Sequence, residues 1–565
     1  MTRIVSTNIT SPLGLTTEEN YTAVKRGESG LRVLDGCLGV PGHHCVGIFS
    51  DQQKAYIRQE GYSWFESIVL YSVKEALSHS SVDPSSKGTI LIVGTSTAGI
   101  EELAEVPEKD GSYLAPGVAV KKIADALGFI NSPITISNAC ISGATAQMLA
   151  HRFLSTHYYD TAVVCGVDVV SSFVLACFDS FKAMSPTICK PFDIERLGLN
   201  IGECAATIIL TNSEEFEDFG WRIVDGCLNN DAYHVSAPIP SGDGVCRTIK
   251  GIMTPVIRDS LACITAHGTA TMFNDQMESK AIEDAGLGDI LITAYKPHFG
   301  HTFGASSVIE SIITMCSIDE GLILPILGFE EIGVSGNIRI CQVKERTDKL
   351  TFLKIQSGFG GCNGSLVYSK LDIPSPPIAH LKYKTVKRVR ITPESLLIDD
   401  KLIPTENTGG LLLSEIYKEF LPDGSRFHKM DLFSKLAYAG TGLLAKNFLD
   451  KFASEDIALF LFTLNGSVLA DRKHLSTFSN PEEYYPSPSV SINTLPNVVL
   501  GEIAVSNSIK GETTLVMLPE EDQTIIEAII NATLSTTHPS VMIYGWVDCK
   551  AEDSFLADIK MLTIN

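Results

Sequence analysis

The sequence is poor in several features that would place it in a functional class at once. Its 565 residues contain 44 lysines and arginines against 66 aspartates and glutamates, which gives a formal charge of −22. A phosphate-binding surface needs clustered basic side chains, so this balance argues against a nucleic-acid-binding protein.

No apolar run approaches the roughly 18 residues of a membrane-spanning helix. The N-terminus lacks the apolar core of a signal peptide. We therefore expect a cytoplasmic protein without a membrane span.

The sequence also lacks CxxC pairs, although it has fourteen cysteines. Closely spaced cysteine pairs are the usual signature of zinc and thioredoxin-type sites, so neither type of site is indicated, and no metal is expected. In a reducing compartment the cysteines are expected to be thiols. Most of them are then small, buried apolar residues.

Apolar segments are abundant, and they follow an α/β pattern. Hydrophobic residues make up 44% of the chain and charged residues 19%, as in globular proteins with a substantial core. Through residues 1–370, apolar runs that favour buried strands alternate with helical patterns. The predicted strands lie at 88–99, 161–170, 204–210, 262–271, 290–301 and 350–361, and the clearest helices at 63–80 and 306–321. This alternation predicts a layered α/β fold whose chemistry gathers in the loops after the strands.

Residues 371–390 contain three prolines and are predicted to link the first unit, 1–370, to a second unit, 391–565. The segment ends in a basic cluster: Lys382, Lys384, Lys387, Arg388 and Arg390. This cluster is either a docking site for an acidic partner or a strand with a solvated basic face, and the second interpretation is slightly favoured.

The second unit partly repeats the first. Residues 115–140 align without gaps with 495–520, at an offset of 380. Upstream, 88–99 resembles 457–471, and 63–80 resembles 431–447. Three matches in the same order indicate a partial copy of the first half of the first unit. In that copy Glu520 takes the place of Cys140.

Cys140 lies where a predicted strand meets a predicted helix. It could be a core residue, half of a disulfide or a nucleophile. The N–H groups and partial positive charge of a helix N-terminus favour a thiolate, and the small residues around Cys140 permit a sharp turn. His267 and His301 each follow a predicted strand beside glycine, where they could serve the thiol as proton-handling partners. We therefore favour the nucleophile. His298 does not have this position beside glycine at the end of a predicted strand, and is interpreted as structural.

The motifs around these residues resemble those of a known family. "NACISGATA", "AHGTAT", "KPHFGHTFGA" and "SGFGGCNG" are similar to the four motifs of the elongating β-ketoacyl-acyl-carrier-protein synthases, which have a thiolase fold. The resemblance covers residues 1–370 and implies α-β-α-β-α layers. It also implies chain elongation in fatty acid or polyketide synthesis, by decarboxylative condensation of an acyl thioester with a malonyl thioester. The protein would bind no cofactor, and its partner would be an acyl carrier protein that presents substrates on phosphopantetheine.

The same resemblance implies roles for individual residues. Cys140 would carry the acyl chain, while His267 and His301 would promote decarboxylation and stabilise the enolate. Lys296 and Glu310 would form a charged pair that orders the site.

Other implied roles concern substrate handling. The N–H groups of Cys140 and Phe359 would form an oxyanion hole, and Phe359 would act as a gate. Thr269 and Thr271 would line the phosphopantetheine arm. Cys362 stands where the family usually has threonine, and is either a second active-site thiol or, as we favour, a near-isosteric replacement.

The second unit resembles a truncated N-terminal ketosynthase half that acts as a chain-length-factor-like partner, as in aryl polyene and flexirubin-type pathways. Without a cysteine at Glu520 it cannot carry a thioester. The resemblance implies an internal pseudo-heterodimer, a homodimer, or both. Two rival functions remain: a catalytically silent chain-length factor, and a Cys-His acyltransferase or hydrolase that uses no malonyl extender. Release of CO₂ from a malonyl thioester would distinguish these alternatives.

Overall fold

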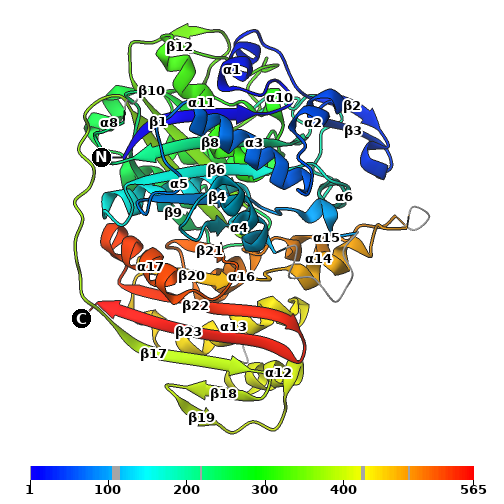
Figure 1. The fold of residues 1–565 in the computed structure, drawn as a ribbon, viewed down its shortest axis with the longest axis vertical. Coiled ribbons are helices and arrows are strands. Elements are labelled where there is room, and N and C mark those ends of the chain that lie inside the picture. The colour runs from blue at the N-terminus through cyan, green and yellow to red at the C-terminus, as the bar shows by residue number, and fades with distance from the viewer. Residues whose placement is uncertain (1, 105–114, 217–218, 422–426, 481–483, 565) are drawn as a thin grey trace.

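The computed structural model describes residues 2–104, 115–216, 219–421, 427–480 and 484–564 (Figure 1). Five strands of the first unit form a mixed sheet in the order β5 (Ile134–Ile136), β4 (Thr89–Gly94), β6 (Thr161–Asp168), β8 (Cys204–Thr211) and β1 (Thr2–Thr10). β4 runs parallel to β5 and β6, whereas β8 is antiparallel to β6 and β1. The central strands are apolar along nearly their whole length because helices cover both faces of the sheet.

A second sheet of the first unit has the order β13 (Arg339–Ile340), β11 (Leu291–Thr293), β10 (Leu261–Thr265), β15 (Thr351–Gly358), β16 (Cys362–Ser369) and β9 (Arg222–Asn230). Helices α5 (Ser142–Ser155) and α11 (Ser306–Asp319) share one apolar core with both sheets. Outside them, α3 (Trp64–Ser78) and α4 (Pro116–Leu127) cover the first sheet. On the opposite side α7 (Asp243–Ile252) and α9 (Met272–Asp284) cover the second sheet. The result is an α-β-α-β-α stack.

Each of the six strands and two helices predicted in the first unit has a counterpart. β10 and β11 end six and eight residues earlier than predicted, and α10 (Lys296–Phe299) occupies part of the predicted 290–301 strand. The shorter elements around this frame are α1 (Thr17–Lys25), α2 (Asp51–Ile57), α6 (Ser172–Ser180), α8 (Pro255–Ser260), β2 (Arg32–Asp35), β3 (His43–Gly47), β7 (Ile201–Gly202), β12 (Leu322–Ile323) and β14 (Glu345–Arg346). The second unit contains α12 (Gly409–Phe420), α14 (Val468–Leu475) and α15 (Pro488–Ser491). Within the described ranges, no helix has both the length and the hydropathy needed to cross a bilayer.

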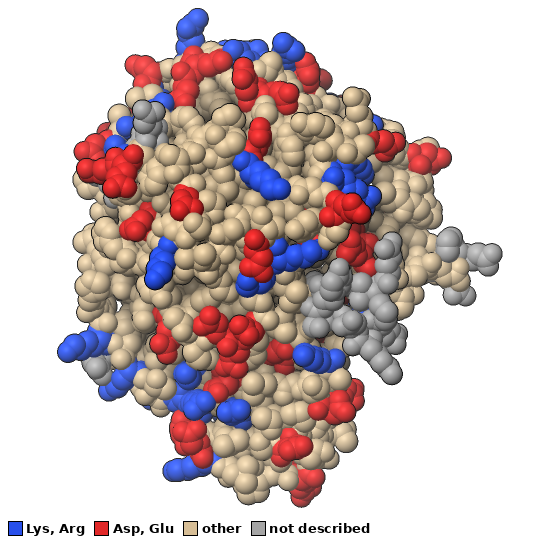
Figure 2. All heavy atoms as spheres, viewed as in Figure 1, with Lys and Arg blue, Asp and Glu red and all other residues tan. Residues whose placement is uncertain are grey.

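The connection between the two units is shorter than the sequence indicates. Residues 371–382 have no regular structure, but β17 (Tyr383–Thr392) begins inside the segment expected to be a linker. The basic cluster therefore lies mostly on a strand, with Lys384 and Arg390 exposed and Arg388 paired with Asp558. On the face in Figure 2, acidic and basic side chains of the described residues are interspersed rather than gathered into one basic surface.

The second unit repeats the first sheet strand for strand. Its order is β21 (Thr513–Met517), β20 (Ile457–Thr463), β22 (Val541–Ala551), β23 (Ser554–Ile564) and β17, with the same pattern of parallel and antiparallel neighbours. Helices α13 (Leu432–Ala445), α16 (Val498–Asn507) and α17 (Gln523–Thr537) correspond to α3, α4 and α5. β18 (Ser395–Ile398) and β19 (Lys401–Ile403) extend the sheet beyond β17.

The two sheets join through their equivalent edge strands. β5 pairs antiparallel with β21, and Ile136 lies opposite Val516, its own counterpart at the 380-residue offset. A residue that faces its own copy marks a local twofold axis, as in the isologous interface of a symmetric dimer. Figure 1 shows the resulting sheet running through both units. The second unit thus lies against β5, directly before the turn that carries Cys140.

A hydrogen-bond motif supports the repeat. Asp168, at the end of β6, accepts hydrogen bonds from the Thr95 hydroxyl and from the N–H groups of the next two residues. Asp548, 380 residues later, accepts them from the Thr463 hydroxyl and the N–H groups that follow it. This correspondence equates Thr95 with Thr463 in the two units. Sequence comparison alone did not identify the motif.

A buried ion pair crosses the interface and provides a test of it. Arg152 on α5 donates from both terminal nitrogens to Glu512, at 2.8 and 2.6 Å, and both side chains are at most 6% exposed. Removing one partner of a buried pair leaves an uncompensated charge, so Glu512→Gln should lower the free energy of unfolding by about 3 kcal/mol in denaturant titrations. The control is Asp125→Asn, which breaks an exposed pair with Lys121 and should cost less than about 1 kcal/mol. Equal losses in the two variants would contradict the buried pair's role in joining the units.

Candidate active site

Cys140 lies in a sharp turn between β5 and α5. The preceding residue, Ala139, has a φ of +47°, a left-handed conformation that is strained for any residue except glycine. Gly143 allows the start of α5 to approach the backbone closely, since a Cβ there would lie 2.3 Å from the Gly304 carbonyl oxygen. The second unit fixes the turn, because the Asn138 side chain bonds to the backbone of β21 at Thr513 (3.0 Å) and Leu515 (2.9 Å).

The Cys140 thiol is protonated in this closed site. Burial raises its pKa to about 12, against the charge of Lys296 and the N–H of Phe359, which favour the thiolate. The backbone N–H groups favour the thiolate as expected, but desolvation outweighs them. The contact with the Phe359 N–H places that donor beside the sulfur, where the predicted oxyanion hole would form.

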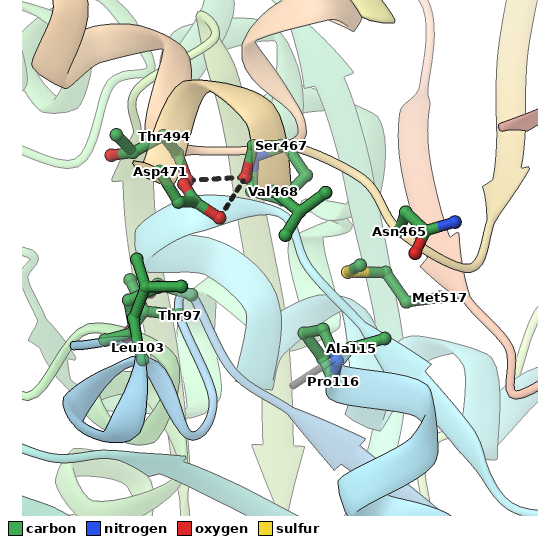
Figure 3. A pocket seen from close by; sticks show the side chains of 13 residues that line it. Thr97, Leu103, Ala115, Pro116, Asn465, Ser467, Val468, Asp471, Thr494 and Met517 are labelled. Carbon is green, nitrogen blue, oxygen red and sulfur yellow. Dashed lines mark hydrogen bonds between the residues drawn. The ribbon is translucent and has the colours of Figure 1, made fainter. Parts of the chain in front are cut away.

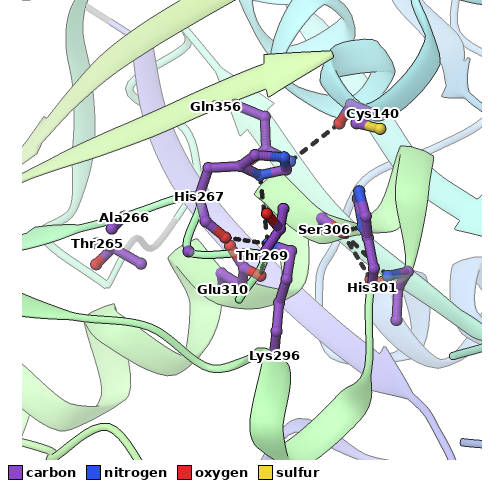
Figure 4. Close-up of polar contacts among 12 residues, drawn as sticks. Cys140, Thr265, Ala266, His267, Thr269, Lys296, His301, Ser306, Glu310 and Gln356 are labelled. Carbon is purple, nitrogen blue, oxygen red and sulfur yellow. Dashed lines mark hydrogen bonds and ion pairs between the residues drawn. The ribbon is translucent and has the colours of Figure 1, made fainter. Parts of the chain in front are cut away.

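His267 and His301 lie next to Cys140. One ligand atom from each of the three side chains lies within 4.8 Å of the other two, and the imidazole centroids are 5.2 Å apart (Figure 4). Among the described residues this is the one cluster able to hold a metal ion. The ammonium of Lys296, 3.3 Å from His267, opposes a cation there.

Both histidines are neutral, and their tautomer follows from their partners. His301 Nδ1 accepts a hydrogen bond from the Phe303 N–H at 3.2 Å. His267 Nδ1 faces Lys296 Nζ, which can only donate. Each ring therefore carries its proton on Nε2. Burial, followed by the charge of Lys296, holds both pKa values far below 6.5. The site thus presents two N–H donors that stay uncharged at neutral pH.

Lys296 and Glu310 form the predicted charged pair, with Nζ 2.8 Å from Oε1. Lys296 also donates to the His267 carbonyl oxygen at 2.5 Å. The other carboxylate oxygen of Glu310 accepts from Lys354 at 2.5 Å, so two buried lysines share one glutamate. Sequence analysis missed Lys354, although a lysine inside the apolar run of β15 was a visible signal. Burial lowers the pKa of Lys354 to about 8.

Two further carboxyl groups hold the His267 loop, and the sequence analysis missed both. Glu278 accepts from the N–H groups of His267 (2.6 Å) and Gly268 (2.9 Å), and burial raises its pKa to about 7. Asp275 accepts from the Thr269 N–H at 3.0 Å. Both acids project from α9, which begins directly after the loop. Their i, i+3 spacing on a helix behind the loop was the available sequence signal.

A pocket of about 320 Å³ leads to the cysteine and the two histidines. Thr269 and Thr271 line it, and their hydroxyls are 2.9 Å apart. On the other side of Cys140 lies a narrow, almost wholly apolar pocket. Phe359 lines both pockets and stacks on Phe178 with a centroid separation of 6.2 Å. Its side chain therefore lies between the two spaces, as the gate prediction requires.

The loop that carries Phe359 is held by the second unit. Asn497, at the start of α16, donates to the Phe359 carbonyl oxygen at 2.8 Å. Gly360 follows with a φ of +88°, and a Cβ there would lie 2.6 Å from the Asn497 amide. This contact was not predicted, because it joins residues far apart in the sequence.

The remaining candidates lie outside the reacting centre. Cys362 lines neither pocket, and its single S–H can donate to the carbonyl oxygen of Phe359 (3.3 Å) or of Asn138 (3.6 Å), which agrees with a hydroxyl-like replacement. Glu520 is exposed in the turn before α17. His298 contacts the Glu28 carbonyl oxygen at 2.6 Å, as a structural residue would.

Two family models match the part of the chain that builds this site. Residues 56–215 match "Beta-ketoacyl synthase, N-terminal domain", and residues 222–330 match "Beta-ketoacyl synthase, C-terminal domain". Cys140 lies in the first matched segment, and His267 and His301 lie in the second.

Individual proteins extend the comparison. The 3-oxoacyl-[acyl-carrier-protein] synthase 2 of Vibrio cholerae is 25% identical over 408 residues, which span 64% of this chain and 97% of the relative. The solved structure titled "PfaC Keto synthase-Chain length factor" has a TM-score of 0.76 at 14% identity, and covers 100% of this chain and 78% of its own. "The ishigamide ketosynthase/chain length factor" has a TM-score of 0.57 at 23% identity, and covers 65% and 98%. These matches confirm the predicted thiolase-like ketosynthase fold.

The lysines beside the histidines should set the acidic limit of the site's activity. Burial and Lys296 lower both histidine pKa values, and Lys354 lowers them further. Removing that charge in Lys354→Met should raise both pKa values, so imidazolium would form at higher pH. The acidic limb of the pH–rate profile for malonyl-thioester decarboxylation should then move to higher pH. Lys349→Met, which removes an exposed lysine from the same region, is the control. An unmoved limb in Lys354→Met would count against this coupling.

Proposed function

We propose that this chain is a β-ketoacyl-acyl-carrier-protein synthase that elongates acyl chains by decarboxylative condensation. The observation that carries the proposal is the meeting of Cys140 with two neutral histidines at the inner end of one pocket. The alternatives lack comparable support. A catalytically silent chain-length factor would not require Cys140, His267 and His301 together. A hydrolase would not require two imidazole donors in addition to the oxyanion N–H groups.

In the first half-reaction, the Cys140 sulfur attacks the carbonyl carbon of a carrier-bound acyl thioester. The carrier's C–S bond breaks, and the thiol proton leaves with the carrier sulfur. The N–H groups of Cys140 and Phe359 stabilise the negative oxygen that develops, since both lie at the sulfur. The acyl chain then occupies the apolar pocket beside Phe178.

In the second half-reaction, a malonyl thioester enters through the larger pocket, where Thr269 and Thr271 contact the phosphopantetheine arm. Its terminal carboxylate leaves as CO₂, and the electrons of the broken C–C bond form an enolate. The Nε2–H groups of His267 and His301 stabilise the enolate oxygen. The enolate carbon attacks the acyl thioester, a C–C bond forms, and the Cys140 sulfur leaves and takes up a proton.

We further propose that residues 1–370 form the catalytic unit and that 383–565, which include β17, act as a non-catalytic, chain-length-factor-like partner within the same chain. Three contacts between the units support this division. β5 pairs with β21, and Asn497 donates a hydrogen bond to the Phe359 carbonyl oxygen. Thr494 and Leu495 of the second unit line the apolar pocket beside Cys140. The acyl carrier protein is the proposed external partner. A role in an aryl polyene or flexirubin-type pathway stays a hypothesis based on the sequence of the second unit.

Replacing the nucleophile should separate the two half-reactions. Cys140→Ala should abolish acylation of the protein, measured by intact mass after incubation with acyl thioesters. It should retain malonyl decarboxylation, because that step uses the histidines. His267→Ala and His301→Ala should each reduce CO₂ release by about 10²–10⁴-fold while some acylation of Cys140 persists. His298→Ala is the matched control. Elongation by the Cys140 variant would exclude the proposed function.

The contact between Asn497 and the gate loop should matter for turnover. Asn497→Ala removes the amide donor of the Phe359 carbonyl oxygen and leaves it only the weak Cys362 thiol, so kcat for condensation should fall about tenfold. Asn493→Ala, on the exposed part of the same segment, should leave it unchanged. A normal rate in Asn497→Ala would show that the second unit does not act through this loop.

A further inference from the structure

A third cavity, next to the apolar pocket, lies between the two units. It shares Ser96, Thr97 and Thr494 with the pocket that reaches Cys140, so the two spaces adjoin. Leu103 and Pro116 of the first unit line one wall (Figure 3). Its free volume of about 30 Å³ is room for one or two water-sized groups. The cavity is thus suited to a small terminal group rather than to a further length of chain.

The wall supplied by the second unit is polar. Asn465, Ser467 and Asp471 line it, the last from α14. Asp471 Oδ1 is enclosed and has no hydrogen-bond partner among the described residues. Asp471 Oδ2 lies 3.3 Å from the Ser467 hydroxyl, whose single proton it shares with the Thr494 carbonyl oxygen at 2.9 Å. The carboxyl group therefore has unused hydrogen-bonding capacity beside the cavity.

The internal repeat shows that this polarity is particular to the second unit. The matching aspartate motifs equate Thr95 with Thr463. Eight residues further along each unit, Leu103 of the first is equivalent to Asp471 of the second. Both residues line the same cavity, together with the equivalent pair Pro116 and Pro496. The cavity thus lies near the local twofold axis, with leucine on one side and a carboxyl group on the other.

The chemistry of this wall limits what it can receive. Burial, and next to it the neighbouring Asp431, raise the pKa of Asp471 well above its usual value, which favours the neutral acid. A protonated carboxyl both donates and accepts hydrogen bonds. The apolar neighbours Val468 and Met517 would disfavour a charged group.

We propose that the cavity binds the far end of the acyl chain attached to Cys140, and that Asp471 selects chains that end in a neutral hydrogen-bonding oxygen, a hydroxyl or a carbonyl. This inference rests on the proposed function, because it requires an acyl chain on Cys140. It goes further by assigning a specificity-determining residue to the second unit and a chemical class to the chain terminus.

The test uses the full-length protein and a series of acyl thioesters of increasing length. At each length the chain ends in methyl, hydroxyl or carboxylate. Acylation of Cys140 is followed by intact mass and its rate by kcat/KM. At the length that reaches the cavity, the wild-type protein should prefer the hydroxyl over the methyl terminus by about tenfold, and should reject the carboxylate.

Two variants separate a specific role from a structural one. Asp471→Leu installs the residue found at the equivalent position of the first unit, and should abolish the hydroxyl preference without slowing short methyl-ended chains. Asp471→Asn keeps a donor and an acceptor and should retain most of the preference. Hydroxyl preference that persists in Asp471→Leu, or that is absent at every length in the wild type, overturns this inference alone. Failure of every thioester to acylate Cys140 overturns the synthase proposal and this inference with it.

Discussion

The antiparallel pairing of β5 with β21 is the constraint on which the rest of the structure depends. β5 has only three residues and ends at the turn that carries Cys140. Its outer edge would expose unpaired backbone groups next to the active site, and β21 satisfies them. Asn138 then bonds to the β21 backbone, so the residue two positions before the nucleophile is held by the other unit. The geometry of the elbow is therefore a property of both units together.

Burial has the largest effect on the pKa values of the site, and its direction differs between the cysteine thiol and the histidines. It raises the pKa of the Cys140 thiol and lowers those of both histidines, so all three are neutral at physiological pH. Two lysines on one glutamate add a net positive charge behind His267. That charge favours anions that form in front of the histidines, such as an enolate, and opposes imidazolium. Neutral N–H donors backed by a buried cation are well suited to stabilise a developing oxyanion.

Much of this arrangement could be predicted from the sequence. Local apolar patterns located the strands and helices of the first unit, and motifs of a few residues located Cys140, His267 and His301. The repeat was visible because its copies align without gaps. The residues that were missed act over long sequence distances: Lys354 reaches Glu310 from another strand, and Asn497 reaches the gate loop from another unit. No short-range pattern encodes such contacts. The predicted linker is too long, because the strand with a basic face that the sequence favours at its end, β17, pairs with β23 and so belongs to the second unit.

The duplication covers only part of the first unit. In the first unit the cysteine comes from the domain at 56–215 and both histidines from the domain at 222–330. The copied segment matches only the cysteine-bearing part, so no counterpart of the His267 and His301 loops accompanies it. A thiol at position 520 would have no such histidine loops beside it, and Glu520, which occupies the position, is exposed. The copy retains the edge strand, the aspartate-bound turn and the helix at whose start Asn497 bonds to the Phe359 loop. It departs from the original where its wall meets the cavity, with Asp471 in place of a leucine. The pairing of the two sheets is thus repeated while the lining of the cavity differs, which fits the proposed role of the second unit as a partner that shapes the substrate's space.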